Sequence, residues 1–265
     1  MSPRTLAILI IHDLRFLAVD AFRMLGDACV MKIVTWNLER RKIASAAGSI
    51  AVEYLHSQAP DFMFLTETRT DFLQRNGHLA FGNHPGAHFA ENERKVAIWS
   101  KFPLEQIDSV GDSRLPPNRY VSASVNTPSG KLRIICVCIP WHMANVRYGD
   151  KNREPWQSHI EFLEILPEVL VQFDEPIIIA GDFNQRIPRV KGGVIAAAEA
   201  MQKCFKGYDI VSEGIIDGLE RPGIDHIALG PEFRYSKVFG WSNVFEGRKV
   251  SDHDGAGCEF TVKSG

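Results

Sequence analysis

A series of short apolar and β-branched segments constrains the fold of this chain more than any other feature of its sequence. From Met31 on, these segments occupy residues 32–36, 61–67, 95–100, 120–126, 131–140, 176–184, 224–230, 232–240 and 256–262. They are bounded by polar, glycine- or proline-containing stretches, a pattern typical of β-strands. In "VNTPSGKLRI" (125–134), a Pro-Ser-Gly turn between two such runs predicts a β-hairpin.

Three segments with a helical period lie between some of these strands. They span residues 39–58, 156–173 and 192–205, and Pro167 predicts an interruption of the second. No repeat, low-complexity run or linker divides the sequence. We therefore expect one mixed α/β domain in which sheets pack together and helices cover the outside.

Residues 1–30 form a separate segment in this interpretation. The apolar run Leu6–Ile11 is broken at once by His12 and Asp13, so it is too short and too charged for a membrane-spanning helix of about 20 residues. It also has no convincing signal-peptide cleavage site. We interpret residues 1–30 as an N-terminal extension, either helical or an upstream start, and residues 31–265 as the domain. Attachment of the extension to a membrane surface is the less favoured alternative.

The composition weakens one functional class. The 265 residues carry a formal net charge of −2, so the chain has no global basic field to attract nucleic acid. This argues against a tight, sequence-independent DNA-binding protein more than against an enzyme that meets its substrate in one pocket. With 45% hydrophobic and 23% charged residues, the composition is typical of a soluble protein with a sizeable core.

The five cysteines have neither the spacing of a metal site nor that of a disulfide framework. Cys136 and Cys138 alternate along a predicted strand, so both face the same side, and we interpret them as small buried apolar residues. An odd, irregularly spaced set of cysteines fits a reducing compartment. We therefore predict a cytoplasmic location.

Polar side chains follow directly on several predicted strands. Asp182 and Asn184 come after an aliphatic run and are two residues apart, so on extended chain they point the same way. A carboxylate and an amide placed together can orient a water molecule and hold a phosphate oxygen. Gly-Asp-x-Asn is also ordinary turn chemistry, so this stretch alone does not decide between the two.

The same kinds of residue recur at other strand ends. Asn37 and Glu67 end two early strands, Asp225 begins a later one, and Asp252 and His253 precede the last. Each has a simpler explanation, such as a helix cap for Asn37 or a solvated charge for Glu67. Their repetition favours one site assembled from strand ends.

In this order, "TWN", "LTET", "GDFN", "IDHI" and "SDH" resemble the endonuclease/exonuclease/phosphatase family. Its members include DNase I-like nucleases, abasic-site endonucleases, sphingomyelinases and inositol-polyphosphate phosphatases. "KVAIWSKFPL" (95–104) also resembles a family segment, with Lys95 where a glycine is more usual. The resemblance covers nearly all of residues 32–262 and implies a four-layer α/β/β/α sandwich of two mixed sheets.

The resemblance also implies a cofactor and its ligands. It makes Glu67 the main ligand of Mg²⁺ or Mn²⁺, with Asn37 nearby and Asp252 as a further ligand or an outer acid. Oxygen donors of this kind suit a hard divalent cation, which stabilises charge during phosphate-ester hydrolysis.

The implied catalytic residues come from the remaining strand ends. Asp182 would orient and deprotonate the attacking water, and Asn184 would hold the phosphate. His253 would bind a phosphate oxygen, while Asp225 would fix the orientation of its ring.

The family usually has a histidine or tyrosine near the leaving group, at the end of the strand that here spans residues 131–140. Alignment on the strand places Cys138 there, whereas alignment on the following loop places His142 there. The loop also carries Trp141 and Arg153, which suit a phosphate with an attached base. The alternative is an exposed loop with its tryptophans partly in the core.

Two basic features lie beside these motifs. Arg119, at the start of the strand 120–126, is a further candidate for substrate binding. "ERRK" at 39–42 could line the mouth of the site, although we favour a solvated helix face.

These patterns predict a divalent-metal-dependent phosphohydrolase, with a phosphodiesterase or nuclease acting on DNA, RNA or a nucleotide as the first choice. A phosphomonoesterase or a lipid phosphodiesterase of the phosphoinositide or sphingomyelin type is the alternative. A non-catalytic binding module ranks third, because the acidic set is complete. We predict a phosphate-ester substrate as the partner, with no membrane partner and no obligate protein partner.

Overall fold

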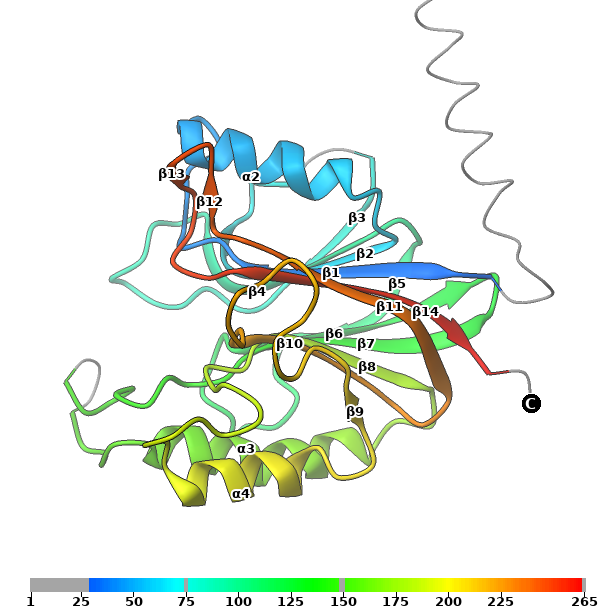
Figure 1. The fold of residues 1–265 in the computed structure, drawn as a ribbon. Coiled ribbons are helices and arrows are strands. Elements are labelled where there is room, and N and C mark those ends of the chain that lie inside the picture. Colours follow the sequence, from blue (N-terminus) through cyan, green and yellow to red (C-terminus); the bar gives the residue numbers. More distant parts are fainter. Residues whose placement is uncertain (1–28, 74–75, 148–150, 264–265) are drawn as a thin grey trace, which may run out of the picture.

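Two β-sheets packed face to face, with helices on both outer sides, make up the computed structural model (Figure 1), which describes residues 29–73, 76–147 and 151–263. Helix α2 covers one sheet, and α3 and α4 cover the other. This arrangement confirms the predicted four-layer α/β/β/α sandwich.

The first sheet has six strands in the order β11-β14-β1-β2-β4-β3. Their bounds are β1 (Met31–Asn37), β2 (Phe62–Arg69), β3 (His78–Phe81), β4 (Glu93–Ser100), β11 (Phe233–Trp241) and β14 (Gly255–Val262). Strands β1 and β2 are parallel and central, whereas the other pairs are antiparallel. The C-terminal ends of these two central strands therefore lie at the same end of the sheet.

The second sheet also has six strands, in the order β5-β6-β7-β8-β10-β9. Their bounds are β5 (Leu104–Asp108), β6 (Tyr120–Thr127), β7 (Gly130–Cys138), β8 (Ile177–Asp182), β9 (Asp209–Ile210) and β10 (Asp225–Leu229). Thr127 pairs with Gly130 across the β6–β7 turn, which confirms the predicted hairpin. A small hairpin of β12 (Val244–Phe245) and β13 (Arg248–Lys249) precedes β14.

The helices are α2 (Ala46–Ser57), α3 (Gln157–Leu170) and α4 (Ile195–Cys204). Ser45 caps α2, because its Oγ accepts a hydrogen bond from the backbone N–H of Gly48 at 3.1 Å. The predicted interruption at Pro167 is wrong, since α3 continues through it to Leu170. Pro167 lies in the last turn and removes only one backbone donor there, while buried neighbours such as Leu166 hold the turn against the sheet.

A hydrophobic core fills the space between the two sheets. It combines side chains from the first sheet, such as Phe62 and Phe64, with Ile134 and Cys136 from the second. Cys136 and Cys138 are buried free thiols, as predicted. This core holds the sheets at a fixed separation, so the strand ends that carry polar residues are held relative to one another.

The interpretation of residues 1–30 as an extension falls almost wholly outside the described residues. Within the described residues, no helix is long and apolar enough to cross a membrane.

Candidate active site

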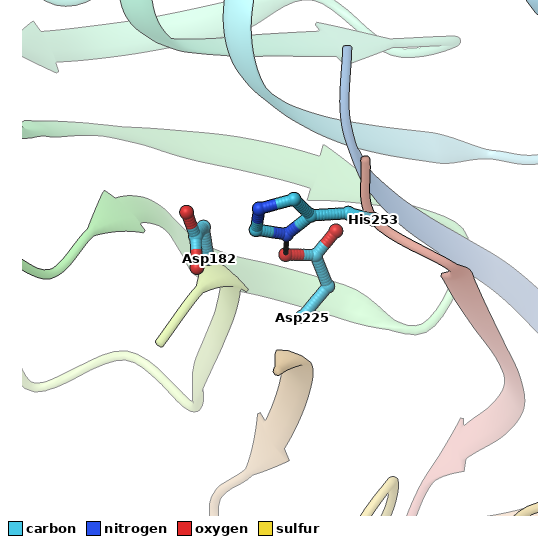
Figure 2. Close-up of side chains that lie close together, drawn as sticks. All are labelled: Asp182, Asp225 and His253. Atoms are coloured by element: carbon cyan, nitrogen blue, oxygen red, sulfur yellow. Dashed lines mark hydrogen bonds and ion pairs between the residues drawn. The ribbon is translucent and has the colours of Figure 1, made fainter. Parts of the chain in front are cut away.

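The candidate site begins with two acids that face each other across the second sheet. Asp182 ends β8, Asp225 begins β10, and the two are direct partners in the antiparallel ladder. Like charges in this position are normally unfavourable. Figure 2 shows both carboxylates beside the ring of His253, and this arrangement indicates a function rather than a structural role.

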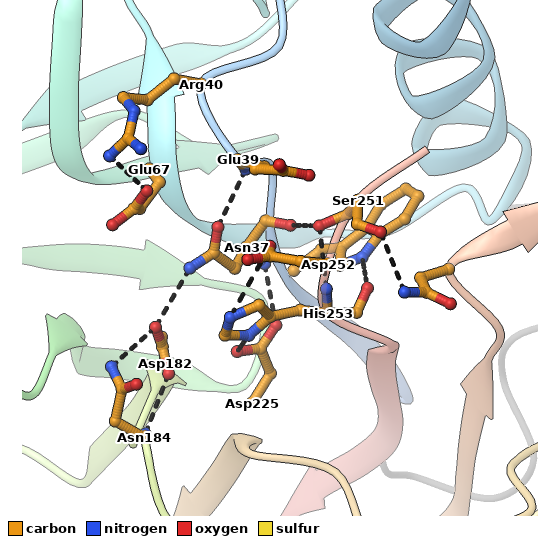
Figure 3. A network of polar contacts seen from close by, with 12 residues as sticks. Asn37, Glu39, Arg40, Glu67, Asp182, Asn184, Asp225, Ser251, Asp252 and His253 are labelled. Atoms are coloured by element: carbon orange, nitrogen blue, oxygen red, sulfur yellow. Dashed lines mark hydrogen bonds and ion pairs between the residues drawn. The ribbon is translucent and has the colours of Figure 1, made fainter. Parts of the chain in front are cut away.

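The first sheet bonds directly to both acids through Asn37, at the end of β1. The backbone N–H of Asn37 donates to Asp225 Oδ2 at 2.8 Å, and its side-chain amide donates to Asp182 Oδ2 at 3.1 Å. Figure 3 shows this network, in which the two sheets are joined through buried polar groups. The relative positions of the strand ends are therefore set by hydrogen bonds as well as by core packing.

Gly181 explains how Asp182 reaches its position. Its φ is +139°, and a Cβ atom there would lie 2.0 Å from the carbonyl oxygen of Val137 on the neighbouring strand. Only glycine avoids this contact and adopts such a φ without strain. The sequence "AGDFN" therefore brings β8 close to β7 immediately before Asp182.

Asp182 is buried, with 2% of its surface exposed, and is held by three N–H donors. Its Oδ1 accepts from the backbone of Asn184 at 2.9 Å, and its Oδ2 accepts from the amides of Asn184 (2.9 Å) and Asn37 (3.1 Å). Burial nevertheless raises the pKa of Asp182 to about 7, with a contribution from the charge of Asp225, against the opposing effects of His253 and the donors. A carboxylate whose pKa lies near neutrality suits a general base.

Both amide hydrogens of Asn184 have protein acceptors. One points to Asp182 and the other to the carbonyl oxygen of Ile139 at 2.9 Å. Asn184 has a φ of +54°, a left-handed conformation that asparagine tolerates better than most residues. In this structure the side chain supports Asp182, so the predicted contact with phosphate requires it to release one of these acceptors.

His253 lies between the carboxylates. Its Nδ1 is 3.0 Å from Asp225 Oδ1, and its Nε2 is 3.8 Å from Asp252 Oδ1. Burial favours the neutral ring, but the charges of Asp225 and Asp182 outweigh it and raise the pKa of His253 to about 10. The ring is therefore an imidazolium at neutral pH.

The segment that carries His253 is fixed to β1. Ser251 donates from its Oγ to the backbone oxygen of Asn37 at 2.5 Å and accepts from the backbone N–H of His253 at 3.1 Å. The indole of Trp36 donates to the carbonyl oxygen of His253 at 2.7 Å. The motif "SDH" therefore includes an anchoring serine that the sequence analysis did not identify.

Glu67, on β2, has different surroundings. Its Oε1 lies 2.6 Å from the ammonium of Lys95, and its Oε2 lies 2.5 Å from the guanidinium of Arg40. Burial raises its pKa, but Lys95, Arg40 and Arg119 together reverse this effect, so the pKa of Glu67 is lowered. Glu67 remains an anion across the range in which Asp182 titrates.

The interpretation of "ERRK" as a solvated helix face is wrong. Helix α2 begins only at Ala46, and Glu39 and Arg40 have φ angles of +47° and +54°. The backbone N–H of Glu39 bonds to Asn37 Oδ1 at 2.9 Å, which turns the chain at the strand end. This turn directs Arg40 toward Glu67.

The donor atoms fit a divalent cation in their chemistry. Asn37, Glu67 and Asp252, the predicted ligands, offer the amide and carboxylate oxygens that Mg²⁺ prefers. Among the described residues, Asp182, Asp225 and His253 form a second group, with one ligand atom of each within 4.8 Å of the others. Glu67 differs from this group because both of its oxygens already contact cationic side chains.

The remaining predicted residues fall into two groups. Arg119 is at the site, where it donates to the carbonyl oxygen of Cys138 at 2.9 Å and lowers the pKa of Glu67. Burial raises the pKa of Cys138 to about 12, so it is a neutral core thiol and a poor proton donor. His142, Trp141 and Arg153 are on the loop after β7.

On that loop, His142 is exposed, and its ring contacts those of Trp141 and Trp156, with centroids 5.1 and 5.5 Å away. Arg153 pairs with Glu161 of α3 at 2.9 Å. These contacts lie within the loop or join it to α3, and Trp141 is 37% exposed.

Lys95 stands out in the sequence where a glycine is more usual, but its ion pair with Glu67 does not. The ladder pairs Thr66 with Val96 and Thr68 with Arg94, so Glu67 and Lys95 are opposite each other. The charge complementarity of these two positions was present in the sequence, but it becomes visible only when the register of β2 against β4 is known.

Most of the chain matches a known protein family. The model of the Endonuclease/Exonuclease/phosphatase family matches residues 34–253. The chain therefore belongs to this family, whose members hydrolyse phosphoester bonds. No curated protein sequence matches the chain.

Solved structures share the fold at low sequence identity. TDP2 from D. rerio, in complex with a single-strand DNA product, has 18% identity and a TM-score of 0.64 over 87% of this chain and 98% of that one. An AP endonuclease from Archaeoglobus fulgidus has 17% identity and a TM-score of 0.64 over 86% and 98%. The catalytic domain of human Nocturnin with a bound sulfate anion has 14% identity and a TM-score of 0.63 over 88% and 94%.

Proposed function

We propose that this protein is a divalent-metal-dependent phosphodiesterase that cleaves a nucleic acid or nucleotide with a water molecule activated by Asp182. The observation that carries the proposal is the buried carboxylate of Asp182, opposite Asp225 and grouped with His253 where the two sheets meet. The similarity in fold to a TDP2 structure that contains a DNA product supports a nucleic-acid substrate.

Asp182 is the general base in this proposal. Three N–H donors fix its carboxylate, and burial raises its pKa to about 7. It is therefore substantially ionised near neutral pH while still basic enough to take a proton from water, the combination that general-base catalysis requires. Asn184 and Asn37 hold the carboxylate in one orientation.

His253 and Asp225 act as a pair. Asp225 accepts the Nδ1 proton of His253 and thereby directs Nε2–H outward, where it can donate to a non-bridging phosphate oxygen. A fixed cationic donor stabilises the negative charge that develops on phosphate in the transition state.

The metal belongs to the side of the site that the first sheet provides. Glu67 and Asn37, with Asp252, would hold Mg²⁺ or Mn²⁺. When bound, the cation would supply positive charge that stabilises the phosphate oxygens during hydrolysis.

The outer residues recognise substrate in this proposal. Arg119, at the site, binds phosphate, while Trp141 and Arg153 on the loop after β7 contact an attached base or sugar. His142 donates a proton or hydrogen bond to the leaving oxygen. Its alternative, Cys138, is a neutral thiol inside the core.

One assay tests the proposal. The protein is incubated with Mg²⁺ or Mn²⁺ and each of plasmid DNA, RNA, bis-p-nitrophenyl phosphate, p-nitrophenyl phosphate and phosphoinositides. EDTA and the Asp182→Asn variant are the controls. We expect metal-dependent cleavage of diesters that both controls abolish.

Other outcomes correct or reject the proposal. Faster cleavage of the monoester would replace it with a phosphomonoesterase, and selective turnover of phosphoinositides would replace it with a lipid-directed enzyme. Absence of metal-dependent turnover on every substrate would favour a binding module.

A further inference from the structure

The carboxylate of Glu67 carries one cationic partner on each oxygen. Lys95 Nζ is 2.6 Å from Oε1, and Arg40 Nη1 is 2.5 Å from Oε2. The side chains of Lys95 and Glu67 are only 13% and 19% exposed, whereas Arg40 is 39% exposed. The pair between Glu67 and Lys95 is therefore shielded from water, in contrast to ordinary surface ion pairs.

Lys95 is held in place by more than its partner. Its backbone belongs to β4, opposite Glu67 on β2, and its ammonium lies 5.5 Å from the centre of the Phe89 ring. A cation over an aromatic face gains a further attraction. The ammonium of Lys95 is therefore held beside Glu67 by its strand position and by the Phe89 ring.

A divalent cation and a lysine ammonium need the same lone pairs of Glu67. Their like charges also repel each other at such short range, and low exposure to solvent strengthens the repulsion. We propose that Lys95 competes with the divalent cation for Glu67, so that the metal binds there only by displacing the Lys95 ammonium. This inference rests on the proposed placement of the metal at Glu67, and its test does not depend on hydrolysis.

Substitution of Lys95 by methionine tests the competition. Lys95→Met keeps an unbranched side chain of similar length and removes the charge. We expect Mn²⁺ to bind the full-length variant at least about tenfold more tightly than the unmodified protein. Binding is measured by titration calorimetry and by the electron paramagnetic resonance signal of free Mn²⁺, neither of which requires turnover.

Two further variants test whether the higher Mn²⁺ affinity of Lys95→Met arises at Glu67. Lys131→Met is the matched control, because Lys131 pairs with Glu175 at 3.4 Å at the end of the second sheet remote from Asp182, and its removal should leave Mn²⁺ affinity unchanged. Adding Glu67→Gln to Lys95→Met should abolish the gain. A gain that survives Glu67→Gln would place the metal elsewhere and overturn the proposal.

Arg40 provides a graded comparison. It contacts the other oxygen of Glu67 but is more exposed, so Arg40→Met should increase Mn²⁺ affinity by a smaller factor than Lys95→Met. Equal or weaker Mn²⁺ binding in folded Lys95→Met, as judged by its thermal unfolding, would contradict the competition.

The unmodified protein offers an independent measurement if Lys95→Met does not fold. Titration with diamagnetic Mg²⁺ should shift the side-chain ¹⁵N resonance of Lys95 as its ammonium leaves Glu67, while that of Lys131 stays in place. An unchanged Lys95 resonance at saturating Mg²⁺ would overturn the proposal. If the metal results agree but no substrate is cleaved, the proposed function fails while the competition at Glu67 stands.

Discussion

The two sheets contribute carboxylates to one site, but they place them in opposite electrostatic surroundings. On the second sheet, Asp182 is buried opposite another carboxylate, and its pKa rises to about 7. On the first sheet, Glu67 is also largely buried, but Lys95 and Arg40 contact its oxygens, and its pKa falls. Similar side chains at strand ends of the two sheets therefore differ in protonation: Asp182 titrates near neutral pH, whereas Glu67 is ionised there.

The largest effect should come from Asp182→Asn, because a neutral amide cannot accept the proton that the carboxylate takes from water. We expect turnover to fall by at least about 10³-fold, because general-base catalysis contributes roughly 10²–10⁴-fold and the substitution also disturbs the orientation of the water. The measurement is kcat with bis-p-nitrophenyl phosphate, with thermal unfolding as the control for folding. Turnover near that of the unmodified protein would remove Asp182 from its proposed role.

The pair formed by His253 and Asp225 gives the next effect. His253→Ala removes a donor to phosphate and should lower kcat by about 10²-fold or more. Asp225→Ala should lower it less, because Asp225 acts by orienting the ring and the strand end rather than by touching substrate. A greater loss in Asp225→Ala than in His253→Ala would argue against this pairing.

A substitution at Gly181 disturbs the part of the site that the second sheet provides, because this residue precedes Asp182. Gly181→Ala places a Cβ against the Val137 carbonyl at a positive φ, and we expect it to reduce the free energy of unfolding by about 1–3 kcal/mol. Because Asp182 is adjacent, turnover should fall as well. Mn²⁺ binding that depends on Glu67 should persist in the folded variant, and calorimetry checks this. Loss of that binding would show that metal binding at Glu67 depends on the position of Asp182.

The pH dependence of stability should differ between His253 and Glu67, because their pKa values are shifted in opposite directions. The pKa of His253 is raised above its unfolded value of about 6.5. Its stabilising contribution is therefore complete below that pH and is lost as the pH rises towards about 10. The pKa of Glu67 is lowered, so its contribution is present above its unfolded value and is lost as the pH falls through the folded one.

Urea unfolding of the metal-free protein at several pH values measures this difference. His253→Gln should flatten the decline in stability between about pH 6.5 and 10. Glu67→Gln should change the pH dependence of the free energy of unfolding only at acidic pH. A decline above pH 6.5 that is the same with and without His253 would contradict the assignment.

Much of the fold could be predicted from local sequence. The aliphatic runs that became β1, β2, β7 and β8 are buried on both faces and therefore stand out as apolar segments. Short strands such as β5, whose side chains are mostly exposed, carry no comparable apolar signal and were not predicted. The continuation of α3 through Pro167 also depends on packing against the sheet rather than on propensity.

For the candidate site, the sequence indicates the residues but not the contacts between them. Its polar residues could be listed because each follows or precedes an apolar strand, and the resemblance gave their order. The contacts that tune them could not be predicted, because they depend on register and on turns. Lys95 meets Glu67 only through the pairing of β4 with β2, and Arg40 reaches it only through two successive left-handed residues.

The central claim is that the two sheets tune their carboxylates in opposite directions, and a site-resolved titration tests it directly. The side-chain carboxyl carbons of the metal-free protein can be followed by ¹³C NMR from pH 3 to 9, with Asp182→Asn and Glu67→Gln used for assignment. The structure predicts a midpoint near 7 for Asp182, because burial and the charge of Asp225 raise its pKa, and one below the ordinary glutamate value of about 4.3 for Glu67. Ordinary midpoints for both carboxyl groups would contradict the account.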